Sequence, residues 1–353
     1  MDKAKVSAII SFYNSEQYAE KCLRSVMDQT LKELEIIVID DGSTDRTRRI
    51  VEETAKDDPR VVYVAKVNGG LASSRKQGMA LATGEYITFV DGDDHIQKNM
   101  YKSMYEKAKQ ENLDIVQCNI IPTGDPDKWK ETERDRKYPE RVMTGKDLLD
   151  LYLKREVMPA LWQRLFRNGL WTAGQFKDFS KIMSDHFNFP EWAVRAKRVA
   201  FLNEPYYYWL TRKGSLGQPE GKRHGVDARN RFLSGISILA FSGMGTMKDH
   251  DLIYRYLMSY ITQAVFHLRE NDYQDVDILF ESWDGAKKYG PFYENAMRLY
   301  PQYAGSAFFY YLENDRKRFR AYIRGEFWKD MAMFIKETHY NGDDLFRGMT
   351  EDV

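Results

Sequence analysis

The sequence has few of the features that mark several large classes of protein. Its 353 residues include two cysteines, Cys22 and Cys118, too few for a disulfide framework in a chain of this length. Lysine and arginine together number 53, as do aspartate and glutamate, so net charge gives no reason to expect a nucleic acid partner. No run reaches the roughly 18 apolar residues of a membrane-spanning helix, and the first residues lack a secretory pattern. We therefore expect a cytoplasmic protein, either in solution or peripheral at the inner face of the membrane.

Short apolar stretches alternate with helical periodicity over about the first 120 residues. The pattern predicts strands at 6–11, 35–40, 61–64, 85–91 and 114–120. Helices are predicted between them at 15–28, 45–56, 73–82 and 99–110. This alternation is typical of an α/β, Rossmann-like fold: a mostly parallel sheet with helices on both faces. Ligands of such sheets bind beyond the carboxyl ends of the strands, so we expect the functional residues there.

The rest of the chain divides into two further regions. We predict one domain part at 1–120, a second at 121–217 that begins with an exposed connection and continues as an irregular, aromatic-rich segment, and an α-helical C-terminal domain at 218–353. The stretch 316–336 has an apolar face and basic residues elsewhere. That pattern fits peripheral membrane contact, but packing within the helical domain, or against a second copy in a homo-oligomer, is the favoured interpretation.

An acidic cluster, "VDGDD" at 90–94, ends one predicted strand. A calcium loop is excluded because Ile96 stands where that loop needs glycine. A phosphatase-type DxDx[TV] strand end is weakened because His95 stands at the Thr/Val place. A DxD site that holds Mg2+ or Mn2+ against a diphosphate fits the cluster.

A second motif precedes that strand. "NGGLASSRKQG", residues 68–78, places a glycine pair before a helix that we expect to begin at Ser73, with Arg75 near its N-terminus. Glycine allows close backbone approach, and a helix N-terminus with an arginine suits an anion. A nicotinamide-binding site is disfavoured because no GxGxxG turn follows the first strand.

Taken together, "VSAIISFYNSEQYAEKCLRSVMDQTLKELEIIVIDDGSTDRT" and "NGGLASSRKQGMALATGEYITFVDGDD" closely resemble glycosyltransferase family 2, the inverting nucleotide-sugar transferases with the GT-A fold. The resemblance covers residues 4–120 closely and continues loosely to about 217. It implies a nucleotide-sugar-binding core at 1–120, an acceptor and catalytic-base part at 121–217, a UDP-sugar donor (Gal, GlcNAc, GalNAc or Glc type), and a hydroxyl acceptor on a saccharide or lipid-linked saccharide.

The resemblance also implies roles for individual donor-binding residues. It places the uracil beside Tyr13 and its N3 hydrogen on Asp41, with Ser11 and Asn14 as neighbouring pocket residues. Arg75 matches an arginine close to the base or the phosphates. Asp91 matches a position near the ribose and the metal, and Asp93 the Mn2+ or Mg2+ ligand itself. The roles of Asp40 and Asp94, as structural caps or as groups that orient their neighbours, stay open.

The family's general base is usually the aspartate of a Glu-Asp pair, followed by an amphipathic stretch, a tyrosine-rich strand and a basic loop. The matching stretch here is "KIMSDHFNFPEWAVRAKRVAFLNEPYYYW", which gives Asp185 as the base. Ser184 stands where the glutamate is expected, and the adjacent His186 is a less favoured base. The loop "WLTRKGSLG" then supplies Arg212, Lys213 and Ser215 as residues that grip the diphosphate.

The sequence therefore predicts a metal-dependent inverting hexosyltransferase of bacterial surface or cell-wall polysaccharide synthesis. The missing glutamate before Asp185 leaves an alternative, a catalytically silent nucleotide-sugar-binding or scaffolding protein of the same fold. A DxD phosphotransferase is a third hypothesis. Which sugar is transferred, and to which acceptor, does not follow from the sequence.

Overall fold

The computed structural model describes most of the first 211 residues and short parts of the remainder. The described ranges are 3–124, 137–153, 156–170, 172–173, 176, 184–211, 264–265, 268–269, 272–280, 310, 315–327 and 329. The chain forms two compact units, residues 1–220 and 221–353.

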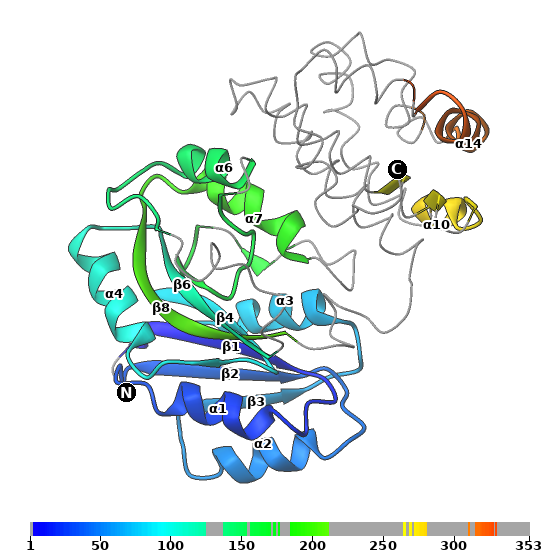
Figure 1. Ribbon diagram of the computed structural model, residues 1–353. Helices are drawn as coiled ribbons and strands as arrows, with labels where there is room; N and C mark the ends of the chain where they lie inside the picture. Colours follow the sequence, from blue (N-terminus) through cyan, green and yellow to red (C-terminus); the bar gives the residue numbers. More distant parts are fainter. Residues whose placement is uncertain are drawn as a thin grey trace. The chain divides into compact units, whose positions relative to one another are not determined.

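An eight-stranded mixed sheet forms the centre of the first unit (Figure 1). Its strand order is β3-β2-β1-β4-β7-β6-β8-β5. The strands are β1 (Val6–Phe12), β2 (Leu34–Asp40), β3 (Val61–Ala65), β4 (Tyr86–Asp91), β5 (His95–Ile96), β6 (Ile115–Gly124), β7 (Arg164–Arg167) and β8 (Val199–Thr211). Strands β1 to β4 pair in parallel, as do β6 and β8, whereas β7 runs antiparallel to both β4 and β6. The mostly parallel sheet expected from the sequence is confirmed.

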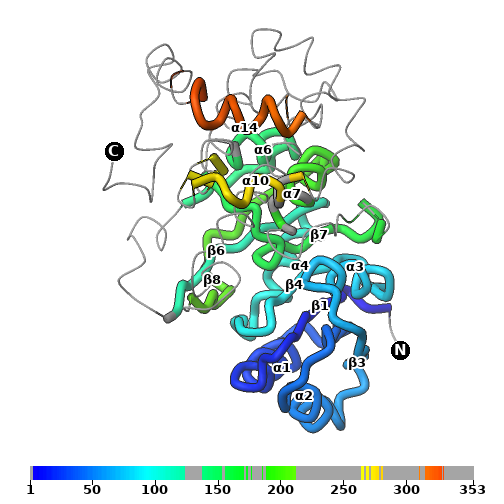
Figure 2. Tube along the Cα trace, turned by 90° about the vertical axis from the view of Figure 1, so that its right-hand side faces the viewer, coloured from blue at the N-terminus to red at the C-terminus, as the bar shows by residue number. Residues whose placement is uncertain are grey.

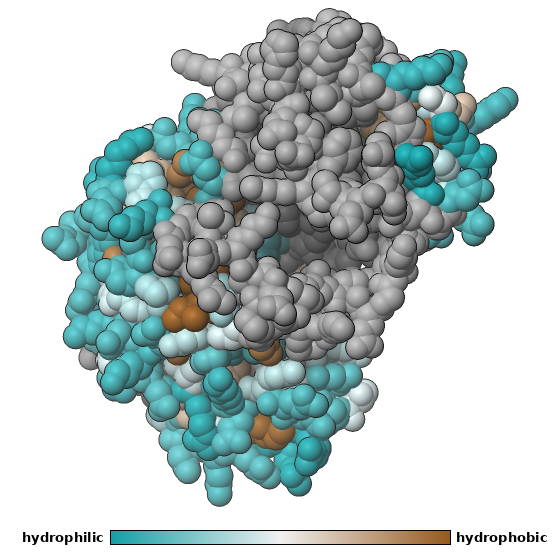
Figure 3. Space-filling model, in the orientation of Figure 1, coloured by the Kyte–Doolittle hydropathy of each residue, from teal (hydrophilic) through white to brown (hydrophobic). Residues whose placement is uncertain are grey.

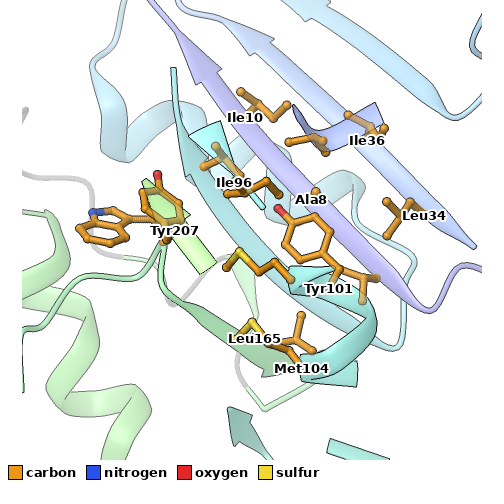
Figure 4. Close-up of a cluster of buried hydrophobic side chains, with 14 of the residues drawn as sticks. Ala8, Ile10, Leu34, Ile36, Ile96, Tyr101, Met104, Leu165 and Tyr207 are labelled. Atoms are coloured by element: carbon orange, nitrogen blue, oxygen red, sulfur yellow. The ribbon is translucent and has the colours of Figure 1, made fainter. Parts of the chain in front are cut away.

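Helices cover both faces of the parallel part. They are α1 (Ala19–Met27), α2 (Thr47–Ala55), α3 (Leu71–Leu81) and α4 (Met100–Gln110). Figures 1 and 2 both place α1 and α2 on one face of the sheet and α3 on the other. Apolar residues of α1 and α4 join alternate residues of the strands in one buried cluster, part of which, including Ala8, Ile36, Tyr101 and Met104, is seen in Figure 4. Cys22 and Cys118 are both buried free thiols in this cluster, as expected.

Three predicted helix starts were wrong by two to four residues. Helix α1, predicted from residue 15, begins at Ala19. Helix α3 begins at Leu71 rather than Ser73, because Gly70 (φ 88°) sets the turn into the helix. Helix α2 begins at Thr47 rather than Asp45. The Asp45 carboxylate lies before that helix and accepts a hydrogen bond from the Thr47 amide at 2.9 Å. These carboxyl and glycine residues shape the loops that enter the helices.

The segment 142–216, expected to be irregular, contains regular structure in its described part. Helices α6 (Gly145–Leu153) and α7 (Ser184–Arg195) accompany β7 and β8. Trp192 of α7 is buried against Phe89 of β4 and Phe166 of β7, with ring centroids 6.0 Å and 5.0 Å away. The many aromatic residues therefore form a second core, between α7 and the face of the sheet opposite α1, and this packing hides the usual strand and helix periodicities.

The described residues of the second unit are mainly helical. They include α10 (Val276–Phe280) and α14 (Arg316–Arg324). Phe319 of α14 packs edge to face on Phe280 of α10 at 5.4 Å, and Arg320 pairs with Asp277 at 2.5 Å. Because Phe319, Tyr322, Ile323 and Phe327 are buried, the apolar face of α14 packs within its own unit, in agreement with the favoured interpretation.

The described surface in Figure 3 is largely hydrophilic, with isolated apolar side chains. Among the described residues, no helix combines the length and apolar character needed to cross a bilayer.

Candidate active site

The carboxyl ends of three parallel strands meet at one edge of the sheet. The register pairs Ser11 of β1 with Ile39 of β2 on one side and with Asp91 of β4 on the other. The loops after β1 and β2 are joined by hydrogen bonds: the Asn14 amide donates to Ser43 Oγ at 3.1 Å, and the Thr44 amide donates to Asn14 Oδ1 at 2.8 Å. The structure thus brings together Ser11, Asn14 and Asp91 as predicted for one site.

Tyr13 and Ser11 contribute differently to this edge. Tyr13 is 52% exposed, so its ring presents a large apolar surface to solvent. Ser11 Oγ is buried and has no hydrogen-bond partner among the described residues. A buried hydroxyl without a partner is uncommon in folded proteins, so Ser11 Oγ is available to a ligand or a water molecule.

Asp41 organises the loop that leads into α3. Its carboxylate accepts hydrogen bonds from the amides of Gly69 at 2.9 Å and Gly70 at 2.7 Å, and it pairs with the Lys66 ammonium. The adjacent Asp40 is also buried and accepts from the Ser43 amide and the Tyr63 hydroxyl, each at 2.9 Å. Asp40 is therefore a structural acceptor, whereas Asp41 joins the second strand to the glycine pair.

Arg75 lies between two carboxylates that are far apart in sequence. Its guanidinium is buried, donates to Asp91 Oδ1 at 2.7 Å through Nη2, and pairs with Asp185 through Nη1. It also lies 5.5 Å from the ring centroid of Phe89. Burial opposes the charge of Arg75, but Asp185 and Asp91 raise its pKa above the ordinary value. This arginine joins the acidic turn after β4 to the first turn of α7.

The pKa of Asp91 is set mainly by its burial, which the charge of Arg75 opposes and two neighbouring carboxylates reinforce. Burial, together with neighbouring Asp185 and Asp93, raises the pKa of Asp91 to about 6, although Arg75 acts in the opposite direction. One quarter of the Asp91 side chain still faces solvent. Burial and like charge disfavour the ionised form of this carboxylate. A nearby cation would stabilise that ionised form.

The two aspartates after Gly92 have different surroundings. Asp93 is partly exposed. Asp94 is buried, where its carboxylate accepts from the Tyr207 hydroxyl at 2.8 Å and from the Leu210 amide at 2.7 Å. Burial and the charges of Asp93 and Asp91 raise the pKa of Asp94 well above its ordinary value. Asp94 therefore fastens β8 to the acidic turn and is turned away from solvent.

Two carboxylates at this turn are candidate ligands for a divalent cation. Among the described residues, no group of three or more His, Cys, Asp or Glu side chains is arranged to hold a metal ion. Asp91 and Asp93 remain as oxygen donors at the open side of the turn. Mg2+ and Mn2+ commonly use one or two carboxylates and complete their shell with phosphate oxygens and water, so this pair fits such an ion.

Asp185 lies in the first turn of α7, and both of its oxygens have partners. One pairs with Arg75, and Oδ2 accepts a hydrogen bond from the Leu161 amide at 3.3 Å. The structure thus brings Asp185 next to Asp91 and Arg75, as expected if it serves the same site. The predicted Arg212, Lys213 and Ser215, and the side chains of Ser184 and His186, lie outside the described residues.

Sequence reasoning missed the contribution of the turn before β7. The Leu161 amide contacts Asp185, and the buried Arg164 binds the carbonyl oxygens of the same turn. The signal in the sequence was weak, because backbone amides leave no mark and "WQRLFR" gives a strand of only four residues. An arginine within such an apolar stretch was the only visible indication.

The fold and the site define an α/β protein with an acidic, cation-compatible edge that faces a glycine loop and a buried arginine. Residues 7–168 match the family model described as glycosyl transferase family 2, and this N-terminal part of the chain belongs to that family. The fold is accordingly of the GT-A type, followed by helices.

Two bacterial proteins are similar to this chain in sequence. The chain is 30% identical over 269 residues to the glycosyltransferase GlyA of Streptococcus pneumoniae, covering 72% of this chain and 37% of GlyA. It is 33% identical over 225 residues to the cholesterol galactosyltransferase of Borreliella burgdorferi, covering 61% of this chain and 62% of that protein. The chain thus spans less than two thirds of either relative.

A solved structure agrees at the level of the fold. Residues 1–349 of S. aureus TarS, in complex with UDP-GlcNAc, superpose with a TM-score of 0.60 at 20% identity, covering 90% of this chain and 89% of that one. Such a low identity supports the architecture rather than any single side chain.

Proposed function

We propose that the protein is an inverting glycosyltransferase that moves a hexose from a UDP-sugar to a hydroxyl group of a saccharide or lipid-linked saccharide. The observation that carries the proposal is the bridge from Asp91 through Arg75 to Asp185. It holds Asp91 and Asp185 close together at one edge of the sheet, where ligands of α/β folds bind, and this supports Asp91 as a donor-side carboxylate and Asp185 as the base. The UDP-GlcNAc seen in TarS supports the donor class.

On the donor side, Tyr13 offers its exposed ring to the uracil, and Ser11 and Asn14 line the same edge. The Asp41 carboxylate, which has about four acceptor positions, uses three of them within the protein and retains one for the uracil N3 hydrogen. Asp93, with Asp91, would hold Mn2+ or Mg2+. When bound, the ion neutralises charge on the departing diphosphate.

On the acceptor side, Asp185 takes the proton from the attacking hydroxyl. The acceptor oxygen forms a bond to the anomeric carbon while the bond from that carbon to the diphosphate oxygen breaks, so UDP leaves with the electron pair and the configuration inverts. Arg75 and the Leu161 amide hold the Asp185 oxygens in place. Arg212, Lys213 and Ser215 are proposed to grip the diphosphate and to exclude water.

The names of bacterial relatives support a biological setting. GlyA and the cholesterol galactosyltransferase are named as sugar transferases, the second with cholesterol in its name, and the poly(ribitol-phosphate) beta-glucosyltransferase of Bacillus spizizenii is 30% identical over 219 residues, covering 59% of this chain and 32% of that protein. We infer a role in bacterial surface or cell-wall polysaccharide synthesis, and an acceptor assay should include a sterol as well as saccharides and lipid-linked saccharides.

Substitution of the proposed base tests the function directly. In Asp185→Asn, transfer should fall by about 10²–10⁴-fold, the usual contribution of a general base, while UDP-sugar affinity measured by calorimetry stays near that of the parent. Asp58→Asn is a matched control, since Asp58 also pairs with an arginine, at 2.6 Å, but lies before β3. Normal turnover by Asp185→Asn would refute the base assignment.

The same assay separates the alternatives. A catalytically silent binding protein, which the missing glutamate at position 184 suggests, would bind UDP-sugars but transfer nothing in the parent chain. A phosphotransferase would release phosphate from simple esters, and this release should be absent here.

A further inference from the structure

Arg164 is a buried cation whose partners are neutral. Its side chain lies in β7 with no exposed surface. Nη2 donates to the Met158 carbonyl at 2.6 Å, Nη1 donates to the Ala160 carbonyl, and the guanidinium lies 4.2 Å from the ring centroid of Phe189 in α7. Among the described residues, no carboxylate lies within ion-pair distance of it. Burying an unpaired charge is costly, so its retention calls for a reason.

The groups that contact the Arg164 guanidinium belong to two segments, and both segments position the Asp185 carboxylate. Met158 and Ala160 belong to the turn that continues to Leu161, and the Leu161 amide donates to Asp185 Oδ2 at 3.3 Å. Phe189 lies four residues after Asp185, one turn further along the same face of α7. Arg164 therefore holds both the segment that donates to Asp185 and the helix that carries it.

We propose that Arg164 is a positioning residue for Asp185. A planar guanidinium can bind two carbonyl oxygens and stack on an aromatic ring at the same time, whereas an ammonium or an apolar side chain cannot. The site then contains two buried arginines with separate duties. Arg75 contacts Asp185 directly, and Arg164 fixes its surroundings without touching it. This inference rests on the proposed function of Asp185 as the base.

The kinetic consequence is a loss of rate without a loss of donor binding. A misplacement of about 1 Å can cost about 10²-fold in rate, so Arg164→Met should lower kcat by that order. The donor KM should stay unchanged, because the side chain of Arg164 contacts none of the proposed nucleotide-binding residues that the structure describes. Arg164→Lys keeps the charge but loses the planar fork, and its kcat should lie between those of Arg164→Met and the parent.

Arg167 offers a matched control on the same strand. Its guanidinium also stacks on an aromatic ring, 5.3 Å from the Tyr86 centroid, and donates to a carbonyl, Leu113 O, at 2.7 Å. Its other side-chain partners in the described part of the chain are Asn112 and Asp114, and neither contacts Asp185 there. Arg167→Met should therefore leave kcat at the parent value, even where it lowers the melting temperature. A kcat equal to the parent's in Arg164→Met or in Arg164→Lys would overturn the positioning role.

A measurement without substrate separates this inference from the proposed function. Melting temperatures are compared for Arg164→Met, Asp185→Asn and the double variant. The double variant should lose less than the sum of the two single losses, because the first substitution already removes the arrangement that the second disturbs. The same cycle with Arg167→Met should be additive. Additivity in both cycles would refute the inference, whereas coupling together with an active Asp185→Asn would refute only the role of Asp185 as base.

Discussion

At the scale of single residues, the aspartates of this site have separate tasks that their spacing in the sequence does not distinguish. Asp91 shares Arg75 with Asp185, whereas Asp94 is buried beneath the turn and holds β8. Asp40 accepts hydrogen bonds from two local donors, the Ser43 amide and the Tyr63 hydroxyl. Asp40 and Asp94, whose roles stay open in the sequence, therefore both accept hydrogen bonds that hold neighbouring segments together.

The separate tasks of Asp91 and Asp94 depend on Tyr207, which contacts both residues. Its buried hydroxyl donates to Asp94 Oδ2 at 2.8 Å and accepts from the Asp91 amide at 3.1 Å. Tyr207→Phe leaves both groups without that partner, so it should lower the free energy of unfolding by about 1–3 kcal/mol, measured by urea denaturation. It should also weaken donor binding, because the acidic turn loses a support.

The neighbouring Tyr206 provides the control. Its hydroxyl meets Ser103 Oγ at 3.1 Å, in a partly exposed place on the same strand. Tyr206→Phe should change the free energy of unfolding by no more than about 0.5 kcal/mol, as for most surface substitutions. Equal effects of the two substitutions would show that the hydroxyl of Tyr207 has no special structural role.

At the scale of secondary structure, α3 matters most because it carries Arg75. Gly78, three residues later, allows this helix to lie close against β1: a Cβ there would come within 2.3 Å of Ile9 Cγ2. Ile9 is fully buried and β-branched, so it has little freedom to move. The depth of α3 on the sheet, and with it the reach of Arg75 to Asp91, is set by this contact.

Gly78→Ala tests that contact. Alanine is a better helix former than glycine by about 1 kcal/mol, yet overpacking typically costs about 1–3 kcal/mol. We expect the free energy of unfolding to fall, and transferase activity to fall with it as Arg75 is displaced. Gly325→Ala, where the added Cβ would meet its first neighbour at 3.5 Å, should be tolerated. A stabilised Gly78→Ala variant would show that α3 is free to move outward.

The elements themselves were predictable to different degrees. The first four parallel strands and their helices follow from local periodicity, because each strand has a buried apolar run and each helix an apolar stripe. Local periodicity did not predict β7 and β8, because β7 is four residues long and β8 mixes buried and exposed positions irregularly. The family resemblance did indicate a tyrosine-rich strand where β8 lies.

At the scale of the whole molecule, ligand binding should be visible as stability. A ligand that binds only the folded state at a hundred times its Kd stabilises it by about 2.7 kcal/mol. We expect UDP-sugars to raise the melting temperature when Mn2+ or Mg2+ is present, and to do so much less without either ion. GDP-sugars should have little effect.

The metal-dependent part of the rise in melting temperature identifies the side chain that binds the ion. Asp93→Asn should abolish the gain from Mn2+ while leaving the melting temperature of the free protein nearly unchanged, because the Asp93 side chain is partly exposed. Asp58→Asn should retain the full gain. If the metal-dependent shift persists in Asp93→Asn, residues other than Asp93 bind the ion. If no nucleotide changes the melting temperature, the proposal of a UDP-sugar donor is refuted.

The sequence by itself determined the parallel sheet and the residues at its carboxyl edge, because local periodicity sets the strands and the end of each strand sets which side chains follow it. Only the tertiary structure decided how those residues are paired. Arg75 and Asp185 are separated by 110 positions, and Asp94 and Tyr207 by 113. Such contacts depend on how α3, α7 and β8 pack against the sheet, and packing of this kind leaves no periodic signal along the chain. For that reason the acidic motif could be located from the sequence, while the division of labour among its aspartates, and the support given by Arg164, could not.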